Sequence, residues 1–205
     1  KGKTVLRNCA IEPEIKDLIT FLNKLGSKIN FRGRTITINE NKLKSSNIFH
    51  EVIYDRIELG TYMIACALLV KKNIKIDRID PKIVKNEINV LKTLGVKIVK
   101  KKSSIIIKKN SKLKKINITT KPYPGFPTDL QAQLMVLLTQ VEGVSKIKEN
   151  IFENRYMHVP ELKRMGAQIV IKGKTAIIKG PTKLTGAEVM ATDLRASVCL
   201  VLAGL

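Results

Sequence analysis

Three aspartates stand at equivalent places in three similar segments, each at the start of a run that is typical of an apolar helix. They are Asp55, Asp129 and Asp193. A helix N-terminus carries unpaired N–H groups and a partial positive charge, so three of them meeting in one region would suit an anionic ligand. A carboxylate at such a place can also be a plain helix cap, worth about 1 kcal/mol. For Asp55, capping alone accounts for the position.

Asp129 and Asp193 have more unusual neighbours. Asp129 follows PYPGFPT, whose prolines at positions 122, 124 and 127 restrict where the helix starts. Arg195 stands two residues after Asp193, and Arg56 follows Asp55 directly. These acid–base pairs are either solvated ion pairs, which contribute little, or parts of a polar cleft. The other charged residues beside predicted helix starts are Glu12, Glu14 and Arg155.

The elements that position these residues repeat along the chain. Gly26, Gly95 and Gly166 lie about seventy residues apart, in the segments FLNKLGSKINFRGRTITI, VLKTLGVKIVKKKSSIIIK and ELKRMGAQIVIKGKTAIIKG. A period of this length indicates a repeated supersecondary unit. Each segment predicts an amphipathic helix that ends at the glycine, followed by two strands joined by a short turn.

Prolines mark where these amphipathic helices begin. Pro13 suits the first turn of the first helix, and Pro81 is expected to play the same part in the second. Pro160 falls only six residues before Gly166, so the third helix is predicted to be short or kinked.

A second set of helices interleaves with the first. The segments are DRIELGTYMIACALLV from Asp55, TDLQAQLMVLLTQVEG from Thr128 and TDLRASVCLVLAGL from Thr192. Helices that are apolar on most of their surface are buried, so strands and the amphipathic helices must surround them. The predicted unit is strand–helix–strand–helix–strand–strand. The chain holds the second half of one unit, two whole units and the start of a fourth, packed about an approximate symmetry axis as an α/β fold.

Composition narrows the function classes. The net charge is +21, from 38 Lys and Arg against 17 Asp and Glu, which first suggests nucleic acid. The lysines are spread over many turns and strands, and aromatic residues make up only 4%, which disfavours that alternative. The cysteines, Cys9, Cys66 and Cys199, form no Cys-x-x-Cys pair and fit a reducing, cytoplasmic setting. Two histidines suggest no metal site, and the longest apolar run, residues 61–70, is too short to span a bilayer.

Several long motifs resemble one enzyme family. PGFPTDLQAQ, IFENRYMHVPELKRMGA and GAEVMATDLRAS are similar to segments of the UDP-N-acetylglucosamine enolpyruvyl transferases (the MurA family), as are RNCAIEPEIKDLITFLNKLG and YDRIELGTYMIA. The related 5-enolpyruvylshikimate-3-phosphate synthases share the repeat but match these motifs less well. The resemblance covers the whole chain and about half of a family member. It implies an incomplete inside-out α/β barrel of repeated βαβαββ units, with residues 1–53 as the last part of the first lobe and 54–205 as most of the second lobe, truncated in its final repeat.

The resemblance also implies a reaction. Enolpyruvyl would be transferred from phosphoenolpyruvate to the 3'-hydroxyl of UDP-N-acetylglucosamine with release of phosphate, the first committed step of peptidoglycan synthesis. No cofactor is implied, and the setting is cytoplasmic. The partners would be the two substrates and the missing N-terminal part of the same enzyme.

Site residues follow by motif from the same resemblance. Asp129 would bind the sugar hydroxyl and act as general base, Asp193 would help with proton transfer, and Ile151 would contact the nucleotide sugar mainly through its backbone. The remaining residues expected at the substrates are Thr128, Phe152, Leu194, Glu12, Asp55, Arg155 and Arg195.

Parts that the family uses for catalysis do not appear in the sequence. The N-terminal Lys-Asn pair that binds phosphoenolpyruvate and the flexible loop with the catalytic Cys or Asp have no counterpart here. The chain is therefore expected to be a fragment of a longer gene product or a truncated copy, inactive alone. A basic repeat protein that binds nucleic acid and a non-catalytic remnant are the alternatives.

Overall fold

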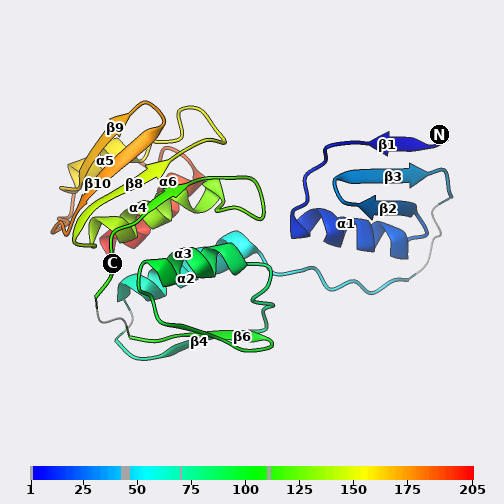
Figure 1. Ribbon diagram of the computed structural model, residues 1–205, viewed down its shortest axis with the longest axis horizontal. Coiled ribbons are helices and arrows are strands. Elements are labelled where there is room, and N and C mark those ends of the chain that lie inside the picture. The colour runs from blue at the N-terminus through cyan, green and yellow to red at the C-terminus, as the bar shows by residue number, and fades with distance from the viewer. Residues whose placement is uncertain (1, 43–46, 70, 110–111) are drawn as a thin grey trace. The chain divides into compact units, whose positions relative to one another are not determined.

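The computed structural model describes residues 2–42, 47–69, 71–109 and 112–205. The chain divides into two compact units, Lys1–Tyr54 and Asp55–Leu205 (Figure 1). The boundary predicted from the resemblance, between residues 53 and 54, lies one residue earlier. The assignment of these units to two lobes of an enzyme stays a prediction.

Unit 1 is a small antiparallel sheet with one helix against it (Figure 1). Its elements are β1 (Thr4–Leu6), α1 (Pro13–Lys24), β2 (Lys28–Arg32) and β3 (Thr35–Asn39), and the strand order is β1-β3-β2. Pro13 opens α1 as predicted. The segment after the sheet returns to α1, where the His50 imidazole lies 3.2 Å from the Asp17 carboxylate.

Three apolar helices form the centre of unit 2. They are α2 (Arg56–Leu69), α4 (Gln131–Thr139), which continues directly from the short 3-10 helix η1 (Thr128–Leu130), and α6 (Leu194–Gly204). Every residue of α4 is buried, and α4 packs against both α2 and α6. The prediction of a buried central helix is therefore confirmed for α4.

For α2 and α6 the prediction of burial on most of the surface is wrong. Each buries one side only, and Tyr62 on α2 and Val201 on α6 are 58% and 65% exposed. The physical reason is that their outer apolar sides line an open groove, described below, instead of packing against a further element of the described chain.

Two sheets and two amphipathic helices surround the central helices (Figure 1). One sheet has the order β4-β6-β5 and the other β7-β8-β10-β9, in which only β7 and β8 are parallel. Their elements, with the two surface helices, are β4 (Ile74–Asp77), α3 (Lys85–Thr93), β5 (Ile98–Lys100), β6 (Ser104–Ile107), β7 (Asn117–Thr119), β8 (Gly143–Lys148), α5 (Val159–Arg164), β9 (Gln168–Lys172) and β10 (Thr175–Gly180). The segment from β7 to β10 is one complete unit in the predicted order. In the preceding copy, the described residues 47–55 form no strand before α2, so the first strand of the predicted order is not seen there.

The three repeat glycines have the same backbone conformation. Gly26, Gly95 and Gly166 have φ angles of 96°, 97° and 98°, the left-handed conformation that closes α1, α3 and α5. The short third helix is confirmed, since α5 has six residues with Pro160 in its first turn. The role predicted for Pro81 is wrong: α3 begins at Lys85, and Pro81 belongs to the turn before it, where the Asp80 carboxylate accepts a hydrogen bond from a backbone N–H. Among the described residues, no helix has both the length and the apolar character needed to cross a bilayer.

Candidate functional site

A charged cluster of unit 2 is centred on Asp129, in η1 at the start of the buried helix α4. Its Oδ1 accepts hydrogen bonds from Arg155 Nη2 at 2.8 Å and from Arg195 Nε at 2.8 Å, and Arg195 Nη2 lies 2.7 Å away. Arg155 comes from the loop after β8 and Arg195 from the first turn of α6. The side chains keep exposed fractions of 26%, 21% and 39% for Asp129, Arg155 and Arg195. A ligand can therefore reach a carboxylate whose charge is balanced and whose position is set by two guanidinium groups.

Asp193 lies beside this cluster and immediately precedes α6. Its Oδ1 accepts a hydrogen bond from Arg195 N at 2.7 Å, and its backbone oxygen accepts one from Ser197 N at 2.9 Å. Arg195 thus connects two of the three aspartates: its backbone binds Asp193, and its side chain binds Asp129.

His158, also in this region, is almost completely buried, and its Nε2 has no hydrogen-bond partner. Burial lowers the pKa of His158 to about 4, with Asp193 acting in the opposite direction and Arg155 in the same direction. The imidazole is therefore neutral near pH 7. From the sequence, His158 was considered only as a metal ligand, and its position one residue before the short helix α5 was the missed signal.

Asp55 serves as a cap at the start of α2. Its Oδ1 accepts hydrogen bonds from Ile57 N at 2.7 Å and Glu58 N at 3.2 Å. The following Arg56 is buried, with its guanidinium 3.7 Å from Glu87 and over the ring of Tyr123. The capping alternative therefore accounts for the contacts of Asp55.

Asp55 nevertheless shares a cavity with the start of α6. A groove of about 550 Å³ between α2 and α6 is lined by Asp55, Leu194 and Arg195, with Gln133 of α4 among the other lining residues. Most of the remaining lining is apolar, and Leu194 is 71% exposed there. The structure thus places Asp55 and Leu194 along one groove that Arg195 also lines.

The other predicted contact residues fall into two places. Thr128 is buried beside Asp129, and the loop with Ile151 and Phe152 lies across from it, with the Arg155 guanidinium 5.0 Å from the centre of the Phe152 ring. Glu12 belongs to unit 1, at the start of α1, where its Oε2 is buried without a hydrogen-bond partner.

Two buried polar residues beside the cluster were missed. Glu149 and Thr120 are 2% and 0% exposed and are hydrogen-bonded to each other at 2.8 Å. Strand alternation was the available signal, because Ser145, Ile147 and Glu149 follow one another at every second position and all three are buried. A carboxylate that continues the buried face of a strand requires partners.

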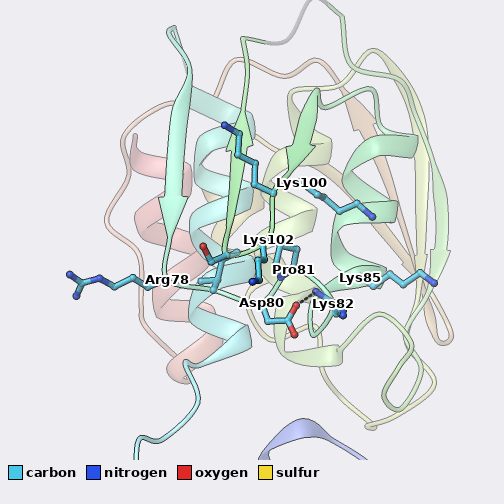
Figure 2. A pocket seen from close by; sticks show the side chains of 10 residues that line it. Arg78, Asp80, Pro81, Lys82, Lys85, Lys100 and Lys102 are labelled. Atoms are coloured by element: carbon cyan, nitrogen blue, oxygen red, sulfur yellow. Dashed lines mark hydrogen bonds between the residues drawn. The ribbon is translucent and has the colours of Figure 1, made fainter.

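A separate basic cavity of about 960 Å³ lies between the turn before α3 and the β5–β6 turn. Figure 2 shows that Arg78, Lys85 and Lys100 extend outward in different directions instead of converging. No aromatic residue lines it, so it offers no surface on which a base could stack. These features give no support to the nucleic-acid alternative. Within the described part of the chain, no group of three or more His, Cys, Asp or Glu side chains is placed to hold a metal ion.

The fold and this cluster define an α/β protein of repeated units in which charged side chains gather at the start of a buried helix. The family model described as EPSP synthase (3-phosphoshikimate 1-carboxyvinyltransferase) matches residues 1–205, and the chain belongs to this family. The predicted relation to the UDP-N-acetylglucosamine enolpyruvyl transferases is confirmed by curated relatives. The chain is 58% identical over 207 residues to a UDP-N-acetylglucosamine 1-carboxyvinyltransferase of Pelagibacter ubique and 52% identical over 205 residues to one of Halothermothrix orenii.

The matches cover different fractions of this chain and of its relatives. All of this chain is covered, but it spans only 49% of the length of each of these relatives. Among solved structures, the enolpyruvyl transferase NikO from Streptomyces tendae has a TM-score of 0.83 at 28% identity, with 98% of this chain and 48% of that chain covered. An EPSP synthase from Acinetobacter baumannii has a TM-score of 0.72 at 20% identity, with 100% and 50% covered, which shows the shared fold alone. The predicted incomplete enolpyruvyl transferase fold is confirmed.

Proposed function

We propose that this chain forms part of an enzyme that transfers enolpyruvyl from phosphoenolpyruvate to the 3'-hydroxyl of UDP-N-acetylglucosamine. The observation that carries the proposal is the Asp129 carboxylate, bound by Arg155 and Arg195 at the start of the buried helix α4. The names of the two curated relatives support the choice of sugar nucleotide. We further propose that the reaction belongs to peptidoglycan synthesis and takes place in the cytoplasm.

Asp129 is the proposed general base. In the transfer, its carboxylate accepts the proton of the sugar hydroxyl while the hydroxyl oxygen forms a bond to C2 of phosphoenolpyruvate, whose C=C bond opens as the CH2 carbon takes up a proton. Loss of a proton from the resulting methyl group re-forms the C=C bond, the bond from C2 to the phosphate oxygen breaks, and phosphate leaves. Since the arginine contacts all meet Oδ1, we assign proton acceptance to Oδ2. The guanidinium groups also provide positive charge for the anionic substrates.

Other residues have supporting roles in this proposal. Asp193 assists proton transfer, and Thr128, Phe152, Leu194 and Asp55 contact the substrates or line their cleft. The Ile151 N–H is already used in a hydrogen bond to Glu149 at 2.7 Å, so its carbonyl is the backbone group assigned to the nucleotide sugar. Glu12 is also assigned to the substrates, and the half of the relatives that this chain does not span is expected to supply further substrate contacts.

The test compares two forms of the protein: the 205-residue chain alone, and a chain extended to the full length of its relatives. Phosphate release from phosphoenolpyruvate in the presence of UDP-N-acetylglucosamine is measured for both. We expect turnover only in the extended form. Absence of turnover in a folded, extended chain would refute the proposal.

A substitution then tests the assigned base. Asp129→Asn keeps the shape of the side chain but cannot accept the proton, so kcat in the extended form should fall about 10²- to 10⁴-fold. Asp55→Asn is the matched control, since Asn caps a helix about as well as Asp, and its effect should be much milder. Thermal melts of both variants separate lost chemistry from lost folding. A near-normal rate for Asp129→Asn would leave Asp129 as a structural residue only.

A further inference from the structure

Glu149 is the most heavily hydrogen-bonded buried acid beside the candidate site. It directly follows β8 and is 2% exposed. Its Oε1 accepts hydrogen bonds from Thr120 Oγ1 at 2.8 Å, Ile151 N at 2.7 Å and Phe152 N at 3.2 Å. Its Oε2 accepts one from Thr128 Oγ1 at 2.9 Å. Four donors meet one carboxylate, so both oxygens of this buried side chain have hydrogen-bond partners.

These bonds join three segments that are distant in sequence. Thr120 directly follows β7, Thr128 begins η1 immediately before Asp129, and Ile151 and Phe152 belong to the loop after β8. Thr120 extends the set, because its Oγ1 also accepts a hydrogen bond from Asn150 N at 3.0 Å. Three consecutive N–H groups, those of residues 150–152, are therefore held by the Glu149–Thr120 pair.

We propose that Glu149 is a positioning residue that fixes the loop of residues 150–152 relative to the start of the helix that bears Asp129. The inference rests on the proposed function for its consequence: the loop backbone and the Asp129 carboxylate hold the same sugar nucleotide. Glu149 itself is buried and acts through Thr128 and the loop, not by contact with the substrate. Its role is to fix the distance between the loop backbone and the Asp129 carboxylate. A misplacement of about 1 Å can reduce a rate by about 10²-fold.

The chemistry of the side chain predicts an unequal response to two substitutions. Glu149→Ala removes both acceptors and releases all four donors. Glu149→Gln keeps one oxygen for Thr120, Ile151 and Phe152, and turns its amide toward Thr128, whose hydroxyl can accept a hydrogen bond instead of donating one. Glu149→Gln should therefore preserve most of the geometry, and Glu149→Ala should not.

The first measurement uses the 205-residue chain and follows amide hydrogen exchange at residues 150–152 and at the start of η1. In Glu149→Ala we expect exchange at Ile151 and Phe152 to be at least about tenfold faster, the factor that corresponds to loss of one net hydrogen bond. In Glu149→Gln it should change by less than about threefold. Thr139→Val is the control: it also removes a buried hydroxyl, bonded to the Val136 carbonyl oxygen at 2.7 Å, but at the far end of α4. Unchanged exchange in Glu149→Ala would overturn the proposal.

The second measurement uses the chain extended to the length of its relatives. For Glu149→Ala, we expect kcat/KM for UDP-N-acetylglucosamine to fall about 10²-fold, mainly through a higher KM for the sugar nucleotide. KM for phosphoenolpyruvate should stay unchanged, and Glu149→Gln should recover most of the loss. A purely structural role would lower the active fraction with both KM values unchanged, and this result would also overturn the proposal.

Two further variants cover the case in which Glu149→Ala does not fold. Thr120→Val removes the bond from Thr120 Oγ1 to Glu149 Oε1 and the acceptor for Asn150 N, and it should raise the same KM, whereas Thr120→Ser keeps the hydroxyl and should not. If the parent extended chain shows no turnover, the proposed function fails, but the exchange measurement still decides whether Glu149 holds the two segments together.

Discussion

The neutral, buried histidine beside Asp193 makes the stability of unit 2 depend on pH. His158 is 2% exposed and its Nε2 has no hydrogen-bond partner to stabilise a second proton. Burial lowers the pKa of His158 from 6.5 to about 4 in the folded protein. The unfolded chain has the ordinary value and binds the proton more readily. Protonation therefore favours unfolding.

The sign and size of this pH effect follow from the linkage between proton binding and folding. Above pH 6.5 the imidazole is neutral in both states, and its full contribution to stability is present. As the pH falls from 6.5 toward 4, the unfolded state gains the proton first, so the free energy of unfolding decreases. The difference between 6.5 and about 4 corresponds to about 3 kcal/mol, since one pKa unit is worth about 1.4 kcal/mol. Below pH 4 both states are protonated and no further loss arises from this residue.

The assay is urea unfolding of the 205-residue chain at a series of pH values between 7 and 4, followed by circular dichroism. His158→Gln removes the titrating group. Between pH 7 and pH 4, we expect the free energy of unfolding of this variant to fall by about 3 kcal/mol less than that of the parent chain. Carboxylates titrate in both proteins and cancel in the difference. His50→Gln, in unit 1, is the control for loss of a histidine elsewhere. Parallel pH profiles for the parent and His158→Gln would refute the reasoning.

Three further predictions concern stability and reactivity. Burial raises the pKa of the Cys199 thiol to about 12, so iodoacetamide at pH 8 should modify Cys9 in the native chain and leave Cys199 unmodified, as read by mass spectrometry; equal labelling would contradict the buried position. Gly180→Ala should lower the free energy of unfolding by about 1–3 kcal/mol, because the new Cβ would lie within 2.7 Å of a backbone carbonyl oxygen at the end of α4, whereas Gly186→Ala meets open space and should be neutral by the same unfolding assay. Tyr156→Phe should cost about 1 kcal/mol, since the hydroxyl lies 2.9 Å and 3.1 Å from carbonyl oxygens of β8 and of the β9–β10 turn; an unchanged melting temperature would show that these bonds contribute nothing.

Sequence patterns that mark helix ends predicted much of the fold. The glycine repeat located the ends of α1, α3 and α5 because each helix closes through a left-handed residue, and φ near 97° at Gly95 is a conformation that glycine adopts without strain. The prolines were less reliable. A proline suits both the first turn of a helix and the turn before it, so Pro81 alone could not distinguish these two places.

Burial of the apolar helices was predicted less well, because helix periodicity reports composition and not neighbours. The central helix α4 and its companions α2 and α6 have equally apolar sequences, yet only α4 is covered on all sides. Whether Tyr62 or Val201 is covered depends on which elements lie beside it, and that is a property of the assembled fold.

The polar contacts of the candidate site could also not be predicted from local sequence patterns. The aspartates were located from sequence because a helix start has a recognisable pattern. The arrangement around Asp129 depends on Arg155 and Arg195, which lie 26 and 66 positions away in the chain. Glu149 was missed for a related reason: its donors come from positions 2, 3, 21 and 29 residues distant. Only the pairing of β7 with β8 brings the most distant of them, Thr120, to it.

The three equivalent aspartates have diverged in what their carboxylates bind. Oδ1 of Asp55 accepts hydrogen bonds from N–H groups of its own helix, and Oδ1 of Asp193 accepts one from the N–H of Arg195. Asp129 differs, because its Oδ1 accepts hydrogen bonds from two arginine side chains contributed by other elements. A repeated unit supplies three similar helix starts, but a repeat alone cannot supply Arg155 from a loop and Arg195 from a neighbouring helix to one of them. The non-equivalent contacts, and not the repeated position, are therefore what distinguish Asp129 as the candidate base.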